Sequence, residues 1–282
     1  MLVSSKELLK DAFEKHYAVG AFNVENMEMV MAVLSAAEET QSPVIMQTTP
    51  GTIKYAGTDF YSANIRAAAE RTKIPVVCHL DHGNNFELAV RAFHDGYTSI
   101  MIDGSKLPFE ENIALTRSIV EVCHAGNVPV EAELGRVGGK EDDLDNTKSQ
   151  NPFTDPNEAA EFAERTGCDF LAVAVGTAHG VYKGTPQINF EVLEKIHGLV
   201  KIPLVLHGTS GVPEEQVTKC INLGMAKVNY ATDLRIAYTH GVKEYMKGSP
   251  DGFDPKKYGA FGMEEVKNYV IQKMNLLKNQ KF

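Results

Sequence analysis

The chain has 282 residues, and its hydrophobic content of 43% is enough for a large core without any segment of disordered composition. Its formal net charge of −9 at pH 7 argues against nucleic acid or an anionic membrane as the main partner, because such surfaces attract basic proteins. An anionic small substrate is not excluded, since local cations decide whether it binds.

Strand-like and helix-like segments alternate after an opening helix at 4–16, where Ser4 or Ser5 can cap the first turn. The predicted strands are 18–23, 43–48, 75–81, 99–103, 129–134, 169–175, 203–207 and 227–231. The predicted helices that follow them are 26–40, 58–72, 85–95, 109–126, 155–166, 189–198, 213–223 and 232–246, with a final helix at about 262–277. Strands alternating with helices form a parallel sheet, and eight of them close a barrel.

The sequence therefore predicts an α/β protein with a (β/α)8 TIM barrel, a single domain over 1–282 with an N-terminal helix and an extra C-terminal helix. A doubly wound open sheet is the alternative, but it calls for a glycine-rich first turn that residues 21–26 lack. The connections 135–154 and 176–189 are longer than a barrel requires. Long loops at the C-terminal face of a barrel are usually functional.

Several predicted strands become charged toward their C-terminal ends. Glu131 and Glu133 share one face of their strand because side chains alternate with period two. Asp81 faces inward near the end of the third strand, and Asp103 and His207 end two others. Burying such groups is costly without a cation, hydrogen bonds or a chemical reason. This pattern is what an active site at the mouth of a barrel requires.

Three histidines, His82, His179 and His207, lie at strand ends or just past them. The ends of the third, sixth and seventh strands face one mouth, and three imidazoles with an open fourth position are the ligands of a catalytic zinc. One such histidine alone is more typical of a hydrogen-bonded structural residue. His79 lies one layer deeper and is interpreted as a satisfied interior histidine.

The carboxylates supply candidate acids and bases. Asp81 can exchange a proton with a substrate hydroxyl, and Glu141, on a glycine-flanked loop, can remove a proton next to a carbonyl. Glu133 and Asp103 can orient the ligand histidines or hold another cation. A purely structural role remains the alternative for these two and for Glu131.

The turns 207–211 and 229–233 each run from a strand into a predicted helix, where backbone N–H groups bind phosphate oxygens. Ser210 and Thr232 can add hydroxyl groups, and Lys183 can add a cation. A zinc beside a phosphate site suits an aldolase in which the metal polarises a ketose carbonyl and stabilises the enediolate formed when a carbon–carbon bond breaks.

These motifs resemble the class II (zinc-dependent) ketose-bisphosphate aldolases over essentially the whole chain. In order, they are His79-Leu80-Asp81-His82, Met101-Ile102-Asp103-Gly104-Ser105, Val130-Glu131-Ala132-Glu133-Leu134-Gly135, Gly138-Gly139-Lys140-Glu141-Asp142-Asp143, Gly176-Thr177-Ala178-His179-Gly180, His207-Gly208 and Asn229-Tyr230-Ala231-Thr232-Asp233.

The resemblance implies zinc on the three histidines, with Asp81 as proton donor or acceptor at the aldehyde oxygen. It implies that Glu141 handles the carbon-bound proton of dihydroxyacetone phosphate, and that Asp103 and Glu133 match positions linked to an alternative or second metal. A monovalent cation, Na+ or K+, is implied nearby. The expected substrate-binding residues are Asn23, Thr49, Gly180, Lys183, Gly208, Thr209, Ser210, Asn229, Ala231, Thr232 and Asp233.

Within this family, the chain is similar to the tagatose-1,6-bisphosphate branch in residues 49–52, 172–180 and 229–233, and at Gly262-Met263, where short fructose-bisphosphate enzymes usually carry an arginine. Lys183 departs toward the fructose enzymes. We expect cleavage of D-tagatose 1,6-bisphosphate to dihydroxyacetone phosphate and D-glyceraldehyde 3-phosphate in carbohydrate metabolism. Fructose 1,6-bisphosphate, the substrate of glycolysis, is the alternative because the two sugars differ only at C4.

Other functions remain as alternatives. A Schiff-base aldolase would use Lys227, which faces inward. A zinc hydrolase of the amidohydrolase type wants a His-x-His pair on the first strand, which residues 21–23 lack. A non-catalytic partner subunit would not need the intact set of ligands, acid and base. The resemblance implies a homodimer or homotetramer, and the tagatose enzymes are often paired with a non-catalytic accessory subunit.

The cysteines and the N-terminus bear on location. Four cysteines are widely spaced without a Cys-x-x-Cys pair, which predicts buried thiols in a reduced compartment. Residues 1–7 lack the basic and then apolar pattern of a signal peptide, and no apolar run approaches membrane-spanning length. We expect a cytoplasmic protein.

Overall fold

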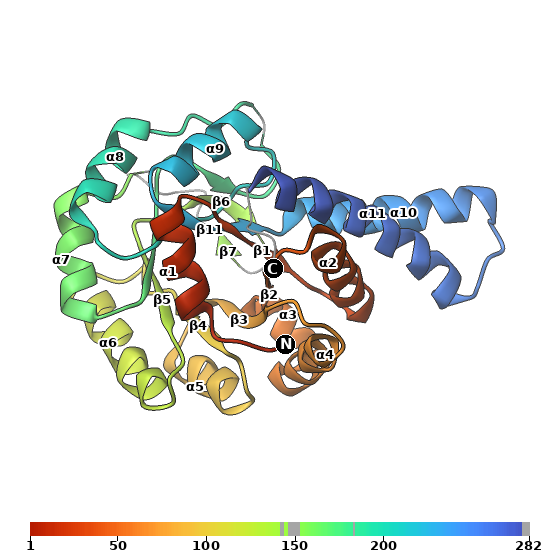
Figure 1. The fold of residues 1–282 in the computed structure, drawn as a ribbon, viewed down its shortest axis with the longest axis horizontal. Coiled ribbons are helices and arrows are strands. Elements are labelled where there is room, and N and C mark those ends of the chain that lie inside the picture. The colour runs from red at the N-terminus through yellow and green to blue at the C-terminus, as the bar shows by residue number, and fades with distance from the viewer. Residues whose placement is uncertain (142–143, 146–152, 183, 278–282) are drawn as a thin grey trace.

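The computed structural model describes residues 1–141, 144–145, 153–182 and 184–277, without the side chains of 140, 141, 144 and 145. Eight parallel strands close into a barrel, each paired with the next in the chain and the first with the last, which confirms the predicted TIM barrel (Figure 1). The strands are β1 (Val19–Asn23), β2 (Val44–Thr48), β3 (Val76–Gly83), β4 (Ser99–Ile102), β5 (Val130–Leu134), β8 (Phe170–Val173), β10 (Leu204–Leu206) and β11 (Met225–Tyr230).

Helices surround the barrel, and several begin where an asparagine side chain accepts a hydrogen bond from a backbone N–H of the first turn, as Asn26, Asn85 and Asn189 do. No described helix is both long and apolar enough to cross a membrane. The helices are α1 (Ser5–Lys15), α2 (Met27–Thr40), α3 (Pro50–Ala56), α4 (Thr58–Glu70), α5 (Phe86–His94), α6 (Phe109–Ala125), α7 (Pro156–Thr166), α8 (Phe190–Leu199), α9 (Glu214–Asn222), α10 (Thr232–Gly248) and α11 (Pro255–Leu276).

Two apolar layers hold the barrel together. Outward-facing strand residues such as Val76 and Leu80 pack against the helices in the larger cluster. A smaller cluster fills the N-terminal end of the barrel, where Leu9 and Ala12 of α1 meet inward-facing residues such as Ile45. The apolar filling therefore occupies one end, and the polar inward-facing side chains gather at the other. All four cysteines are buried and free, as predicted.

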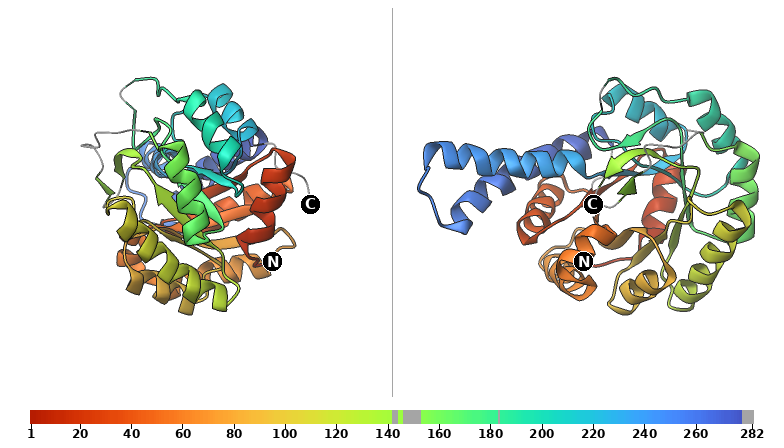
Figure 2. Two further views of the ribbon diagram at one scale, coloured as in Figure 1. Left: turned by 90° about the vertical axis from the view of Figure 1, so that its left-hand side faces the viewer. Right: turned by 180° about the vertical axis from the view of Figure 1, so that it is seen from behind.

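Three segments differ in detail from the prediction. The segment between the predicted strand at 43–48 and the predicted helix at 58–72, to which no element was assigned, forms α3, because Thr49 caps the helix and Pro50 occupies its first turn. The final helix begins at Pro255, earlier than the predicted residue 262, with Asp254 as its cap. The two long connections contribute a small sheet of β6 (Gly138–Glu141), β7 (Leu144–Asp145) and β9 (Ala178–His179). Figure 2 shows this sheet at the end of the barrel opposite α1.

The helices α10 and α11 form a hairpin that projects from the barrel, toward the right in Figure 1. They cross closely at Gly241, where an added Cβ would lie 2.3 Å from the carbonyl oxygen of Phe261, so only glycine fits. The hairpin is tied to the barrel at its C-terminal end, where the backbone N–H of Ala18 donates to the carbonyl of Leu277 at 3.1 Å.

Candidate active site

The three predicted zinc ligands lie together at the C-terminal mouth of the barrel. His82 lies near the end of β3, His179 ends β9, and His207 follows β10. The His207 Nδ1 and His82 Nε2 atoms are 2.8 Å apart, although the residues are 125 positions apart in the chain. One ring nitrogen from each of the three histidines lies within 4.8 Å of the others. The convergence expected from the topology is therefore present.

An irregularity in β3 explains how two consecutive residues both face this mouth. Neighbouring side chains of a regular strand point to opposite faces. The register between β3 and β4 shifts between Leu80 and Gly83, and His82 has a positive φ of 51°. A bulge of this kind re-aims a side chain, so that Asp81 and His82 both line the same cavity.

A carboxylate lies behind two of the three imidazoles. Asp103 Oδ2 is 2.9 Å from His82 Nδ1, and Glu131 Oε1 is 2.9 Å from His207 Nε2. Burial lowers the pKa of His207 well below its ordinary value, so the ring is neutral and carries one N–H. A carboxylate only accepts hydrogen bonds, which places that N–H at Nε2 and the lone pair at Nδ1, toward the other histidines.

This arrangement fits a divalent cation. Burial lowers the pKa of His179 to about 3, which leaves a neutral ring, and its buried Nδ1 has no hydrogen-bond partner among the described residues. Imidazole nitrogens with a free lone pair, oriented by carboxylates, are the usual donor set for such an ion; His179 and His207 are neutral, and His82, whose pKa nearby carboxylates raise, would release its Nε2 proton to the solvent when the ion binds. The 2.8 Å between His82 and His207 is somewhat shorter than the roughly 3.4 Å that two tetrahedral zinc ligands keep, so a small separation of the rings would accommodate it.

The negative charge around His82 is unusually dense. Burial disfavours the charged ring, but Asp81, Asp103 and Glu133 outweigh burial and raise the pKa of His82 to about 10. Burial and nearby Asp103 raise the pKa of Glu133 well above its ordinary value, and its Oε2 lies 3.5 Å from His82 Nδ1. His82, Asp103 and Glu133 form a second group with the spacing of metal ligands.

Asp81 is held by two amides. Asn23 Nδ2 donates to its Oδ2 at 2.9 Å, and Asn229 Nδ2 donates to its Oδ1 at 3.2 Å. Burial acts to raise the pKa of Asp81, but the positive charges of His82 and Lys227 outweigh it and leave the pKa lowered. The side chain is therefore a fixed carboxylate, which can accept a proton from a hydroxyl held beside the histidines.

Most of the predicted substrate-binding residues line one narrow cavity around these groups. Gly208 closes one side of it with φ of 65°, and an added Cβ there would lie 2.7 Å from the carbonyl of Ala178. Tyr182 joins the two walls, since its hydroxyl accepts from the N–H of Ala178 at 2.6 Å and donates to the carbonyl of Gly208 at 2.8 Å. The lining residues are Asn23, Asp81, His82, His179, Gly180, Gly208, Thr209, Ser210, Asn229, Ala231 and Thr232.

Two predicted substrate-binding residues in the described part of the chain, Thr49 and Asp233, are not among those that line the cavity. Thr49 caps α3, with its hydroxyl 3.1 Å from that of Thr52. Asp233 lies in the first turn of α10, where its carboxylate accepts from the hydroxyl of Tyr269 at 2.7 Å. Glu141 ends β6, but its side chain lies outside the described part of the structure, and so does Lys183 altogether.

The role of Gln47 was not predicted from the sequence, and Lys227 was assigned a different role. Gln47 Nε2 donates to Asn23 Oδ1 at 2.8 Å and so orients the amide that holds Asp81. Its inward position in β2 was the available signal. Lys227 forms an ion pair with Glu131 at 2.9 Å instead of lining the cavity, and an ammonium group in an ion pair is not a nucleophile. The geometry therefore disfavours the Schiff-base alternative.

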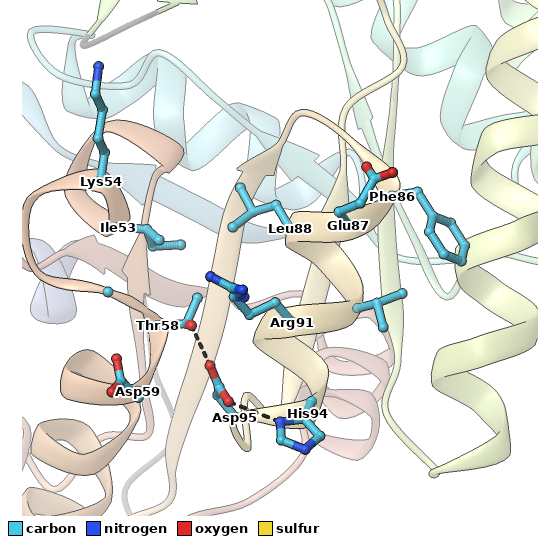
Figure 3. A pocket seen from close by; sticks show the side chains of 12 residues that line it. Ile53, Lys54, Thr58, Asp59, Phe86, Glu87, Leu88, Arg91, His94 and Asp95 are labelled. Atoms are coloured by element: carbon cyan, nitrogen blue, oxygen red, sulfur yellow. Dashed lines mark hydrogen bonds and ion pairs between the residues drawn. The ribbon is translucent and has the colours of Figure 1, made fainter.

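A larger cavity of about 900 Å³ lies outside the barrel, between α3–α4 and α5 (Figure 3). Arg91 and Leu88 of α5 face Ile53 across it, and Thr58 donates to Asp95 at its lower edge. It contains none of the residues that converge on the three histidines. Choosing the active site by cavity volume alone would therefore select a cavity without these residues.

Comparisons with known proteins identify the family of this chain. The chain matches the sequence model of the family described as fructose-bisphosphate aldolase class-II over residues 3–281. The structure resembles that of the YdjI aldolase from Escherichia coli K12 with a TM-score of 0.87 and 39% identity, covering 99% of this chain and 98% of that one.

Two further structures are similar. A putative fructose-1,6-bisphosphate aldolase from Coccidioides immitis has a TM-score of 0.88 and 32% identity over 96% of this chain and 94% of that one. A fructose-bisphosphate aldolase from Campylobacter jejuni has a TM-score of 0.84 and 26% identity over 100% and 97%. The family inferred from the motifs is thereby confirmed, and the chain belongs to the class II fructose-bisphosphate aldolase family.

Proposed function

We propose that this aldolase reversibly cleaves a ketose 1,6-bisphosphate between C3 and C4, giving dihydroxyacetone phosphate and D-glyceraldehyde 3-phosphate. The observation that carries the proposal is the group of three buried histidines beside a fixed carboxylate. His82, His179 and His207 supply the nitrogen ligands, and Asp81 lines the same cavity. Zinc is the proposed ion, because three imidazoles with a free fourth position suit it.

Each group of residues has a proposed role in the reaction. The three histidines would hold a divalent cation, which would act as a Lewis acid on the ketose carbonyl. Asp81 accepts the proton of the C4 hydroxyl in the cleavage direction and returns it in the condensation direction. The backbone and hydroxyl groups at 208–210 and 231–232 bind the phosphate of the ketone half, with a monovalent cation nearby. Glu141 transfers the proton at the carbon that becomes C3 of dihydroxyacetone phosphate.

We propose tagatose 1,6-bisphosphate as the preferred sugar, on the likeness of residues 49–52, 172–180 and 229–233 to that branch. With zinc present, we expect kcat/KM on the tagatose sugar to exceed that on the fructose sugar in a side-by-side assay of purified chain. The two differ only in the C4 configuration, so the same Asp81 contact must serve either. Activity should disappear with a chelator and return with zinc. A higher kcat/KM on fructose 1,6-bisphosphate would reverse the assignment and place the enzyme in glycolysis.

We also propose that the chain forms a homodimer or homotetramer through the hairpin of α10 and α11. Large apolar side chains are exposed on it, with Phe253 92% and Phe261 51% accessible. Burying them against a second copy would recover hydrophobic free energy. In light scattering coupled to size exclusion, the parent should be oligomeric and the Phe253→Asp/Phe261→Asp variant monomeric.

Leu199→Asp, on the exposed end of α8, is the matched control and should leave the assembly unchanged. A parent chain that stays monomeric at micromolar concentration would contradict the proposal. Turnover by the isolated chain would show at the same time that no accessory subunit is required. We place the enzyme in the cytoplasm, since its four buried, free thiols suit a reducing compartment.

A further inference from the structure

A buried ion pair lies below the three histidines, and the proposed reaction does not use it directly. Lys227 of β11 and Glu131 of β5 are 1% and 0% exposed, and Lys227 Nζ lies 2.9 Å from Glu131 Oε2. A buried charge pair is expensive to desolvate, and replacing it with apolar residues is often neutral or stabilising. A contribution to folding stability is therefore a weak explanation for this buried pair. Its contacts indicate another role.

Two chains of side-chain contacts, or arms, start at this pair, and the first leads to the candidate metal ligand. The two oxygens of Glu131 face different partners: Oε1 accepts from His207 Nε2 at 2.9 Å, and Oε2 faces Lys227. His79 Nε2 is also near Oε2, at 3.4 Å, while its Nδ1 lies 2.8 Å from the hydroxyl of Ser99. Lys227 therefore lies against the oxygen of Glu131 that does not contact His207, and so helps to hold the orientation of this side chain.

The other arm leads to the candidate acid and base. Lys227 Nζ donates to Asn229 Oδ1 at 2.8 Å, which fixes the orientation of that amide. The opposite side of the amide, Nδ2, then faces Asp81 Oδ1 at 3.2 Å. Lys227 itself does not line the cavity, so it reaches the reacting groups only through these neighbours.

We propose that Lys227 is a positioning residue that couples the orientation of the metal ligand His207, through Glu131, to the orientation of Asp81, through Asn229. The proposal rests on the proposed function. It predicts that a second substitution can restore the arm to His207 but not the arm to Asp81, because only the first can form without the ammonium group of Lys227. Losing the pair should loosen both the ligand and the carboxylate.

The test compares the parent with Lys227→Met and with the double variant Glu131→Gln/Lys227→Met. Methionine keeps an unbranched side chain without charge, and the glutamine carbonyl can still accept from His207 Nε2 while its amide group faces His79. Zinc affinity is measured by competition with a chromophoric chelator, ligand geometry by the visible absorption of the Co²⁺-loaded protein, and kcat and KM on the ketose bisphosphate. Thermal unfolding confirms that each variant is folded.

In Lys227→Met, we expect zinc affinity to fall by roughly 10- to 100-fold, because outer partners of metal ligands contribute that much. The Co²⁺ spectrum should change, and kcat should fall more than KM rises. The double variant should recover most of the zinc affinity and the parent-like Co²⁺ spectrum, since the arm to His207 is repaired. Its kcat should stay low, because Asn229 still lacks its partner.

The matched control is Ser5→Ala. Ser5 belongs to the same buried polar chain through its 2.8 Å hydrogen bond to Ser99, but it contacts neither Glu131 nor Asn229. It should leave zinc affinity and kcat unchanged. The proposal is overturned if Lys227→Met binds zinc like the parent, if the double variant recovers both properties or neither, or if Ser5→Ala shows the same loss. A parent that neither binds zinc nor cleaves the sugar would refute the proposed function instead.

Discussion

Replacing His207 with alanine is expected to remove the bound metal and the aldolase activity together while the barrel stays folded. The substitution takes one nitrogen from a three-histidine group, and two imidazoles hold an ion poorly. A Lewis acid at a carbonyl contributes several kcal/mol of transition-state stabilisation, so turnover should fall on the order of 1000-fold or more. His207 lies beyond the end of β10, and the apolar strand residues before it remain in place.

Metal content is measured by atomic emission after dialysis, and turnover is measured with and without added zinc. His240→Ala is the matched control, because His240 is an exposed histidine of α10 that lies away from the cavity. It should retain both metal and activity, and both variants should unfold cooperatively on heating. Full turnover by a demonstrably metal-free His207→Ala protein would remove the metal from the mechanism.

The barrel could be predicted because the pattern of apolar residues that specifies each strand is local in the sequence. Alternation along each strand shows which residues face the helices, and Val76 and Leu80 lie in that layer. Parallel strands of one barrel all end at the same mouth, so charged residues at strand ends had to converge. His82 and His207 could therefore be placed together without knowledge of any distance.

The remaining features depend on contacts that no local pattern records. The pairing of Lys227 with Glu131 and of Gln47 with Asn23 follows from the register of the strands and from side-chain rotamers. The small sheet joins β6 to β9 across two connections that looked like loops. Thr49 was predicted from a motif to bind the substrate, and its hydroxyl also caps α3, which the motif did not indicate. A cap and a ligand contact look alike in sequence, because a hydroxyl just before a helix suits either role.

Replacing Asp81 with asparagine should abolish cleavage of the carbon–carbon bond while leaving the metal bound. The amide keeps the size of the carboxylate and its contacts to Asn23 and Asn229 can rearrange, but it cannot accept the proton of the C4 hydroxyl. Loss of a positioned base typically costs 10²- to 10⁴-fold, so we expect kcat for cleavage to fall by about that factor. Asp59→Asn, which changes an exposed carboxylate of α4, should have no effect.

A second measurement separates the role of Asp81 from a general loss of the site. Exchange of the carbon-bound proton of dihydroxyacetone phosphate with solvent deuterium, followed by NMR, involves no C4 hydroxyl. Under the proposed roles it requires the histidine group and Glu141, but not Asp81. Asp81→Asn should therefore still catalyse exchange at a rate near that of the parent. If exchange and cleavage fall together by the same factor, Asp81 acts on the ketone half or on the metal site itself, and the assignment of the C4 proton must move to another residue.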